Sequence, residues 1–220
     1  MTGCQAELPP HSDHRCAVAS DGTSIVLDFD SYGVNQRSHA HIVARLQAEP
    51  HITTLKIIIN QANIQQPEHL YHYLRGFGVP VLQFVPFVAL DDVGALTTES
   101  VHAEQWGAFL IAVFDLWVQQ DIETLHIQYI DAALAIWCGQ GSPFSGDNAL
   151  LVEECRECPV LRFCHGDSPQ HRIANDGKSA LCAGYRQFFT YSAPYMKALR
   201  DLLKQHRSPM ELMTMLAQSR

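Results

Sequence analysis

No segment of the sequence is long and apolar enough to cross a membrane. A membrane-spanning helix needs about 20 consecutive apolar residues, and the longest apolar run, Gly107–Val118, is interrupted by Asp115. The N-terminal residues also lack the basic start and the apolar stretch of a signal peptide. These absences predict a cytoplasmic protein without a membrane partner, in which the seven cysteines stay reduced.

Positive charge is scarce and scattered along the chain. The sequence has 15 Lys and Arg residues against 23 Asp and Glu residues, which gives a formal net charge of −8. An acidic protein repels phosphate backbones unless a local basic patch overrides this field. Because the sequence contains no such patch and no zinc-finger or basic-helix signature, nucleic acid is excluded as the expected partner. P-loop, G-x-S-x-G and H-E-x-x-H motifs are absent as well.

Apolar strands alternate with amphipathic helices over residues 24–138. Hydrophobic residues make up 47% of the chain, which is enough for a substantial core. The expected strands are 24–29, 55–59, 81–85 and 125–129, and the expected helices are 38–48, 67–75, 104–119 and 131–137. This alternation predicts an α/β fold with helices packed on a parallel sheet. Since four such units do not close an eight-stranded barrel, we expect a partial (β/α) barrel or an open parallel sheet.

Changes in composition divide the chain into three segments. A turn-rich stretch at 139–148 marks the main boundary. The expected segments are an irregular N-terminal segment at 1–23, a partial α/β domain at 24–138, and a cysteine-rich segment with C-terminal helices at 149–220.

The end of the chain is expected to form two helices. The first spans about residues 183–205. The second is expected to begin at a capping box made by Ser208 and Glu211, with Pro209 at the first helical position.

Four cysteines carry the strongest chemical signal. They are arranged as Cys155-x2-Cys158-x5-Cys164, with Cys182 further along the chain. A Cys-x2-Cys pair lets two thiolates from one turn reach a single centre, and two more thiolates complete four-coordination. Thiolates are soft ligands, so the candidates are an iron–sulfur cluster or zinc, and the spacing does not separate them. The alternative is that all four are ordinary reduced thiols.

The N-terminal segment holds a second, weaker set of metal-ligand types. Cys4, His11, His14 and Cys16 are the donors that zinc prefers, although their spacing matches no motif. The alternative interpretation, which we favour, is an irregular tail without a metal.

Four titratable residues lie at or near the ends of expected strands. Barrel enzymes place functional groups at the carboxyl ends of strands, and Asp28, Asp30 and Asp131 occupy such positions. Capping or turn chemistry is the interpretation that we favour for each of the three. His126 falls inside an expected strand and is interpreted as a core or edge histidine rather than a base.

Several long strings resemble one family, the anaerobic sulfatase-maturating enzymes, which are radical SAM enzymes. The α/β part contributes IINQANIQQPEHLYHYLRGFGVPVLQFVPFV, LTTESVHAEQWGAFLIAVFDLWVQQDI and QYIDAALAIW. The cysteine-rich part contributes ECRECPVLRFCHGDSPQHR, LCAGYRQFF and APYMKALRDLL, which resemble the end of the family's SPASM domain. The resemblance covers most of the chain from about Leu27 onward.

The resemblance implies cofactors and also marks departures from the family. Family members use S-adenosylmethionine (SAM) and a [4Fe–4S] cluster to oxidise a Cys or Ser of a sulfatase. The SAM-cleaving cluster requires Cys-x3-Cys-x2-Cys, which this sequence lacks. The resemblance therefore implies that the chain starts midway through the barrel of its relatives. The short Cys-Asp segment thought to supply their general base is missing near Cys138–Gly146 as well.

The pattern of retained cysteines implies that one auxiliary cluster site is kept and another is lost. By resemblance, Cys155, Cys158, Cys164 and Cys182 are the ligands of one [4Fe–4S] cluster, with zinc as the alternative. In the family's C-x-G-G-C-P motif, Ser168 stands where the second cysteine would be a ligand of the other cluster.

Two classes of function follow from these observations. The first is a truncated, non-catalytic homologue that keeps one metal site and binds a partner, such as a sulfatase or an intact maturase. An exposed sheet edge, where the parent's earlier strands would pair, would then favour self-association or partner capture. The second is one subunit of a split radical SAM maturase. A regulatory, transcription-related protein built on the same scaffold is a further alternative.

Overall fold

The computed structural model describes residues 14–19, 21–29, 36–141, 151–172 and 177–218. The strands are β1 (His14–Val18), β2 (Ser24–Phe29), β3 (Thr54–Ile59), β4 (Val81–Pro86) and β5 (His126–Ile127). The helices are α1 (Gln36–Ala48), α2 (Pro67–Arg75), α3 (Ala103–Gln120), α4 (Gln128–Trp137), α5 (Glu153–Arg156), α6 (Leu161–Cys164), η2 (Pro169–His171), α7 (Cys182–Lys204) and α8 (Glu211–Gln218).

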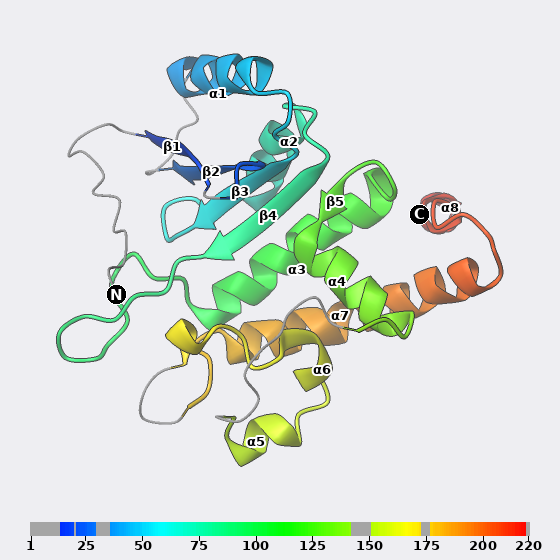
Figure 1. The fold of residues 1–220 in the computed structure, drawn as a ribbon. Helices are drawn as coiled ribbons and strands as arrows, with labels where there is room; N and C mark the ends of the chain where they lie inside the picture. The colour runs from blue at the N-terminus through cyan, green and yellow to red at the C-terminus, as the bar shows by residue number, and fades with distance from the viewer. Residues whose placement is uncertain (1–13, 20, 30–35, 142–150, 173–176, 219–220) are drawn as a thin grey trace.

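The strands form one open sheet in the order β1-β2-β3-β4-β5 (Figure 1). Strands β2 to β5 pair in parallel, and β1 pairs with β2 in the antiparallel direction. The predicted α/β class with an open parallel sheet is therefore confirmed. Among the described helices, none is long and apolar enough to cross a membrane.

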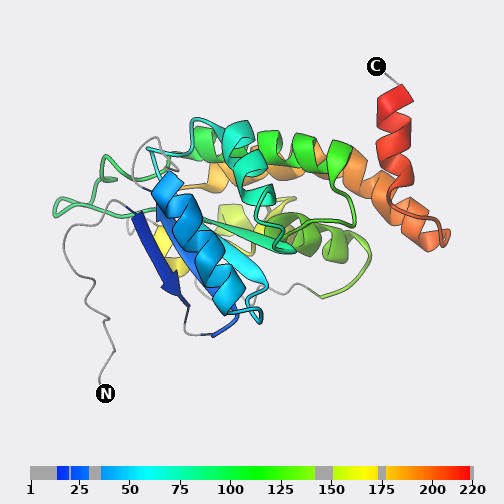
Figure 2. The same cartoon turned by 90° about the horizontal axis from the view of Figure 1, so that it is seen from above.

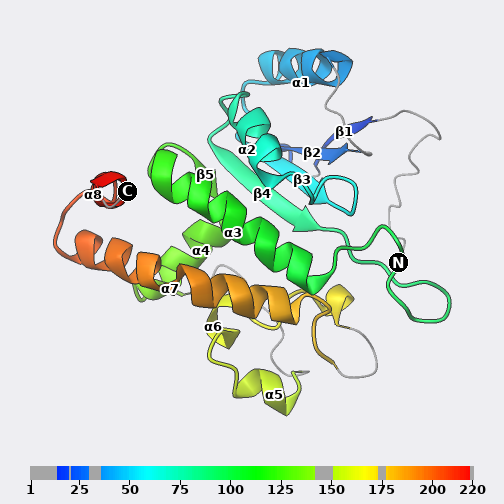
Figure 3. The same ribbon diagram turned by 180° about the vertical axis from the view of Figure 1, so that it is seen from behind.

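Helices α2 and α3 cover one face of the sheet, and α7 lies along α3 (Figure 3). Alternate residues of β3 and β4 are buried, as expected for strands with one face against helices. Phe84 of β4, for example, meets Phe109 of α3 edge to face, with ring centroids 5.2 Å apart. Seen from above, α8 extends away from the sheet beyond the end of α7 (Figure 2).

The expectation of an irregular segment at 1–23 is wrong for His14–Val18, which forms β1. A hairpin joins β1 to β2, with Gly22 at a φ of 67° and Asp21 accepting backbone hydrogen bonds from Thr23 and Ser24. Lys56 holds the pKa of the Asp21 carboxyl well below its usual range by donating a hydrogen bond to it. Asp-Gly is a strong hairpin signal, and it was available in the sequence.

The same strand overturns the expectation of an exposed edge at β2. Strand β1 pairs with β2 over its whole length, from His14 opposite Phe29 to Val18 opposite Ile25. An unpaired edge leaves a row of backbone N–H and C=O groups open to other chains. The N-terminal strand satisfies those groups within the chain itself.

One further local expectation is corrected, and another is met in part. Strand β5 is only His126–Ile127, because just two residue pairs join it to β4 and helix α4 already begins at Gln128. The expected capping box of α8 forms in part. The Ser208 hydroxyl accepts from the Met210 backbone N–H at 3.2 Å, and a hydrogen bond from the Ser208 backbone helps to lower the pKa of Glu211. The Glu211 carboxylate also binds the Arg207 guanidinium.

Helices α3 and α7 touch backbone to backbone at two glycines. A Cβ added to Gly184 would lie 2.1 Å from the carbonyl oxygen of Ala103, and one added to Gly107 would lie 2.9 Å from the Gly184 Cα. Only the missing side chains allow this approach. Because Cys182 opens α7 two residues before Gly184, the contact also fixes where Cys182 stands relative to the sheet.

We predict that Gly184→Ala lowers the free energy of unfolding by about 1–3 kcal/mol, the usual cost of overpacking. An alanine in a helix interior would otherwise add roughly 0.5–1 kcal/mol, so the sign of the change is diagnostic. Chemical denaturation measures it, with Thr190→Ala on the exposed face of α7 as the control. A stabilised Gly184→Ala protein would contradict the close contact.

Candidate metal centre

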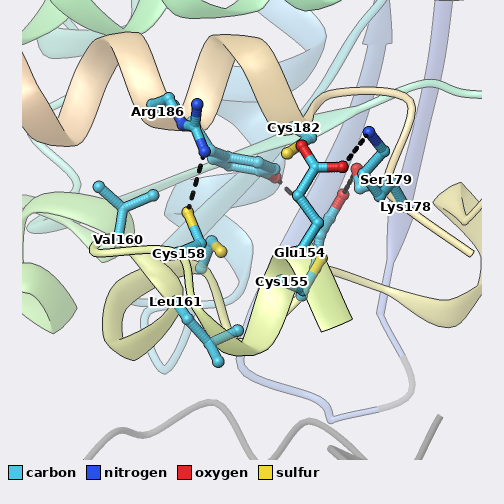
Figure 4. Close-up of a pocket in the computed structure, with 13 residues that line it drawn as sticks. Glu154, Cys155, Cys158, Val160, Leu161, Lys178, Ser179, Cys182 and Arg186 are labelled. Atoms are coloured by element: carbon cyan, nitrogen blue, oxygen red, sulfur yellow. Dashed lines mark hydrogen bonds and ion pairs between the residues drawn. The ribbon is translucent and has the colours of Figure 1, made fainter. Parts of the chain in front are cut away.

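The four predicted cysteines line a single cavity (Figure 4). Cys155 lies in α5, Cys158 follows it, Cys164 ends α6, and Cys182 begins α7. The cavity has a volume of about 20 Å³, which is close to the space of one water molecule. Four thiol groups, from α5, the turn after it, α6 and the start of α7, therefore surround one small space.

Short turns bring the first three cysteines together. The Cys158 N–H donates to the Cys155 carbonyl at 3.1 Å, and the Cys164 N–H donates to the Val160 carbonyl at 3.2 Å. Phe163 is the buried residue of α6, and its ring stacks on Phe189 of α7 with centroids 5.2 Å apart. This aromatic contact anchors α6 to the helix that begins with Cys182.

Basic residues surround the sulfur atoms. Arg186 of α7 approaches Cys158, with 3.7 Å between its Nη2 atom and the sulfur, and Figure 4 shows the side chain pointing to this cysteine. Lys178 binds Glu154 of α5 at 2.8 Å and so ties the Cys155 turn to the segment before α7. Positive charge beside thiols favours their thiolate form, which is the form that binds metals.

Burial acts in the opposite direction on three of the thiols. It raises the pKa of Cys164 to about 11, and it raises the pKa values of Cys155 and Cys182 as well. The neighbouring thiols add to the increase at each site, because like charges close together disfavour ionisation. A metal cation would remove both penalties by neutralising the thiolates.

The donor set fits a thiolate-binding centre, but the sulfur atoms are not placed as ready ligands. Within the described ranges, no group of three or more His, Cys, Asp or Glu side chains has the arrangement of a metal site. The assignment of Cys155, Cys158, Cys164 and Cys182 as ligands thus stays a prediction. Its support is their chemistry and their shared cavity.

Sequence reasoning missed a carboxylate that holds this region together, that of Asp167, whose side chain is 9% exposed. Asp167 accepts hydrogen bonds from Ser179 Oγ at 2.6 Å, from His171 Nδ1 at 2.9 Å and from Tyr185 Oη at 3.2 Å. The Arg172 guanidinium also donates to the Asp167 carbonyl at 3.2 Å. Asp167 thereby joins the chain after Cys164 to the start of α7.

The backbone beside Cys164 is left-handed over three residues, His165, Gly166 and Asp167, with φ values of 48°, 74° and 59°. A Cβ on Gly166 would lie 2.3 Å from Cδ2 of Leu151, so the Leu151 side chain would have to move, and the positive φ itself favours glycine. Asp and His tolerate this conformation only at a cost. The hydrogen bonds of Asp167 offset that cost and keep the turn in place.

The other candidate residues do not join this cavity. Cys138 is the C-cap residue of α4 and is half-buried. His126 is exposed and its Nδ1 atom lies 3.1 Å from the carboxylate of Asp131. Strand β5, which holds His126, lies at the edge of the sheet, in agreement with the interpretation of His126 as an edge histidine.

The remaining candidates can be placed only in part. Cys4, His11 and Asp30 lie outside the described residues. His14 and Cys16 belong to the backbone of β1, and Asp28 belongs to β2.

Comparisons with known proteins place the chain in a family. The uncharacterized protein YidF of Escherichia coli (strain K12) is 43% identical over 161 residues, which cover 73% of this chain and 91% of YidF. The chain belongs to the YidF family. No protein-family model matches the sequence.

The chain is also a distant homologue of a sulfatase-maturating enzyme. The serine-type anaerobic sulfatase-maturating enzyme of Bacteroides thetaiotaomicron is 25% identical over 229 aligned positions, which cover 71% of this chain and 55% of the enzyme. The chain thus spans about half the length of that relative.

Solved structures show the same fold. The structure of anSMEcpe with bound AdoMet covers 84% of this chain, with a TM-score of 0.63 and 15% sequence identity. The complex of anSMEcpe with AdoMet and the Cp18Cys peptide gives a TM-score of 0.61 at 16% identity. In these two comparisons the chain covers 67% and 71% of the solved chain.

We predict that Asp167→Asn loosens the segment from Cys164 to Cys182. The amide keeps one acceptor oxygen and turns an N–H group toward the donors, which should lower the free energy of unfolding by about 1–3 kcal/mol. Hydrogen exchange measured by mass spectrometry should show faster exchange in this segment. The exposed Asp92→Asn variant is the control, and unchanged protection in Asp167→Asn would show that the carboxylate does not hold the turn.

Proposed function

We propose that this protein is a non-catalytic relative of the anaerobic sulfatase-maturating enzymes that holds one metal centre and binds a partner protein. Cys155, Cys158, Cys164 and Cys182 are the proposed ligands. The observation that carries the proposal is their convergence on one cavity, together with the homology to a sulfatase-maturating enzyme.

A [4Fe–4S] cluster is the first candidate for this centre. Four cysteine thiolates are the usual ligands of such clusters, and they would leave no iron open for substrate. Such a fully ligated centre would then be structural. Ligand binding would supply folding energy to the segment between α5 and α6.

Zinc is the second candidate, because the same four thiolates can hold either a cluster or a single ion. Tetrahedral coordination by four cysteines is common in structural zinc sites.

The proposed partner is a sulfatase or an intact maturase, and self-association of the chain is a second proposed outcome. The 220 residues contain no Cys-x3-Cys-x2-Cys motif, so a SAM-cleaving cluster would need ligands that these residues do not supply. A split maturase in which this chain is one subunit is therefore the alternative. A regulatory role is compatible with the same metal centre.

Metal analysis of protein purified without oxygen tests the centre. We expect about four irons and four sulfides for each chain if the centre is a [4Fe–4S] cluster, or about one zinc if it is a tetrahedral zinc site. Cys158→Ala should abolish most of the bound metal and lower the melting temperature.

Cys138→Ala is the matched control, because Cys138 is also a half-buried thiol but lies outside the cavity. It should keep the wild-type metal content. The proposal fails if the wild-type protein holds no metal, or if Cys158→Ala and Cys138→Ala retain equal amounts.

The absence of catalysis is tested separately. Reduced protein incubated with SAM should release no 5′-deoxyadenosine above a sample without protein, measured by chromatography. An intact sulfatase-maturating enzyme in the same buffer is the positive control. Turnover by the isolated chain would exclude a non-catalytic role, whereas turnover only after adding a second polypeptide would favour the split enzyme.

A further inference from the structure

A second, larger cavity lies at the carboxyl end of β4. Its volume is about 470 Å³, within the range of about 300–1,000 Å³ that is typical of small-molecule sites. The carboxyl ends of parallel strands are where α/β proteins place their ligands. The walls come from β4, the start of α4, the turn after Cys164 and Tyr185 of α7.

Three residues, Cys164, Asp167 and Tyr185, line both this space and the cysteine cavity, so they form the wall between the two. Tyr185 donates to one oxygen of Asp167, and His171 and Ser179 donate to the other. A carboxylate accepts hydrogen bonds and donates none, so Nδ1 of His171 carries the proton of this contact. Since His171 also lines the cavity, its other ring nitrogen, Nε2, is the one left to bind a ligand.

A second imidazole in the same wall has a buried ring nitrogen without a hydrogen-bond partner. His165 lines the cavity, and its Nε2 atom is buried without a hydrogen-bond partner. A buried polar atom that lacks a partner is costly and is uncommon in folded proteins. A ligand or an ordered water in the cavity would supply the missing hydrogen bond.

The charges of the wall limit what the ligand can be. Among the described residues that line the cavity there is no Lys or Arg, and Asp167 is the one carboxylate. Phosphates and carboxylates would enter without a counter-charge, which is unfavourable at a partly enclosed site. Aromatic rings, including Phe84 and Phe163, supply apolar contact area on the remaining walls.

We propose that this cavity binds a small neutral or cationic molecule whose hydroxyl or amine group donates a hydrogen bond to His171. The proposed site adjoins the proposed metal centre and shares Cys164 with it, but the proposal stands whether or not the cysteines hold a metal. The His165 and His171 imidazoles form hydrogen bonds with the polar end of the ligand, and the aromatic wall contacts its apolar body.

Tyramine and 4-hydroxyphenylacetate are matched probes, because they share a phenol and differ in ammonium against carboxylate. Saturation-transfer NMR and titration with the full-length purified protein would measure both. We expect saturable binding of tyramine, and binding of 4-hydroxyphenylacetate at least about tenfold weaker, a difference of about 1.4 kcal/mol. His171→Phe, which keeps an aromatic ring, should weaken tyramine binding by a similar factor.

Gln83→Lys provides a variant with a gain of function, since Gln83 is a half-buried lining residue of β4. It should weaken tyramine binding and strengthen binding of 4-hydroxyphenylacetate, which a folding defect would not do. The proposal is overturned if the wild-type protein fails to bind tyramine, if it binds both probes equally, or if His171→Phe changes nothing. Metal content measured on the same samples keeps a failed metal centre distinct from a failed ligand site.

Discussion

The contact between Gly107 and Gly184 is the constraint on which the rest of the structure depends. It allows α7 to lie against α3 at backbone distance, and α3 in turn carries the aromatic residues that pack on the sheet. Cys182 and Tyr185 are placed by the same helix. The α/β part and the cysteine-rich part therefore share one packing interface, so a change at these glycines would reach both the core and the candidate site.

Much of the fold is encoded locally, and those parts could be predicted. Residues 24–29 form an apolar run bounded by turn residues, and the observed strand has the predicted limits. Pro67 marks the start of α2, and α2 spans the predicted residues. The strand at His14–Val18 was missed because its flanking sequence is polar, although Asp21-Gly22 carried the signal. Strand β5 was overestimated because its apolar residues continue directly into α4.

The candidate site was only partly predictable, for a physical reason. The four cysteines are recognisable by chemical type and spacing, and the structure brings them to one cavity. Asp167 has no comparable pattern, since its partners Ser179 and Tyr185 lie 12 and 18 residues away on other elements. The second cavity depends on β4, α4 and α7 meeting in space. Such a meeting leaves no periodic trace in the sequence.

The hairpin between β1 and β2 has a consequence for any assembly that would complete the barrel. An added strand from another chain has to pair with β2, where β1 already lies. A tethered strand competes at an effective concentration that is about millimolar for a short connection. A second polypeptide would therefore have to displace β1 from β2. Assembly would then be a strand-exchange reaction that begins only above a threshold concentration of the second polypeptide. In the proposed split enzyme, strand β1 would thus compete with the partner strand for β2, and this competition would set how tightly the partner must bind.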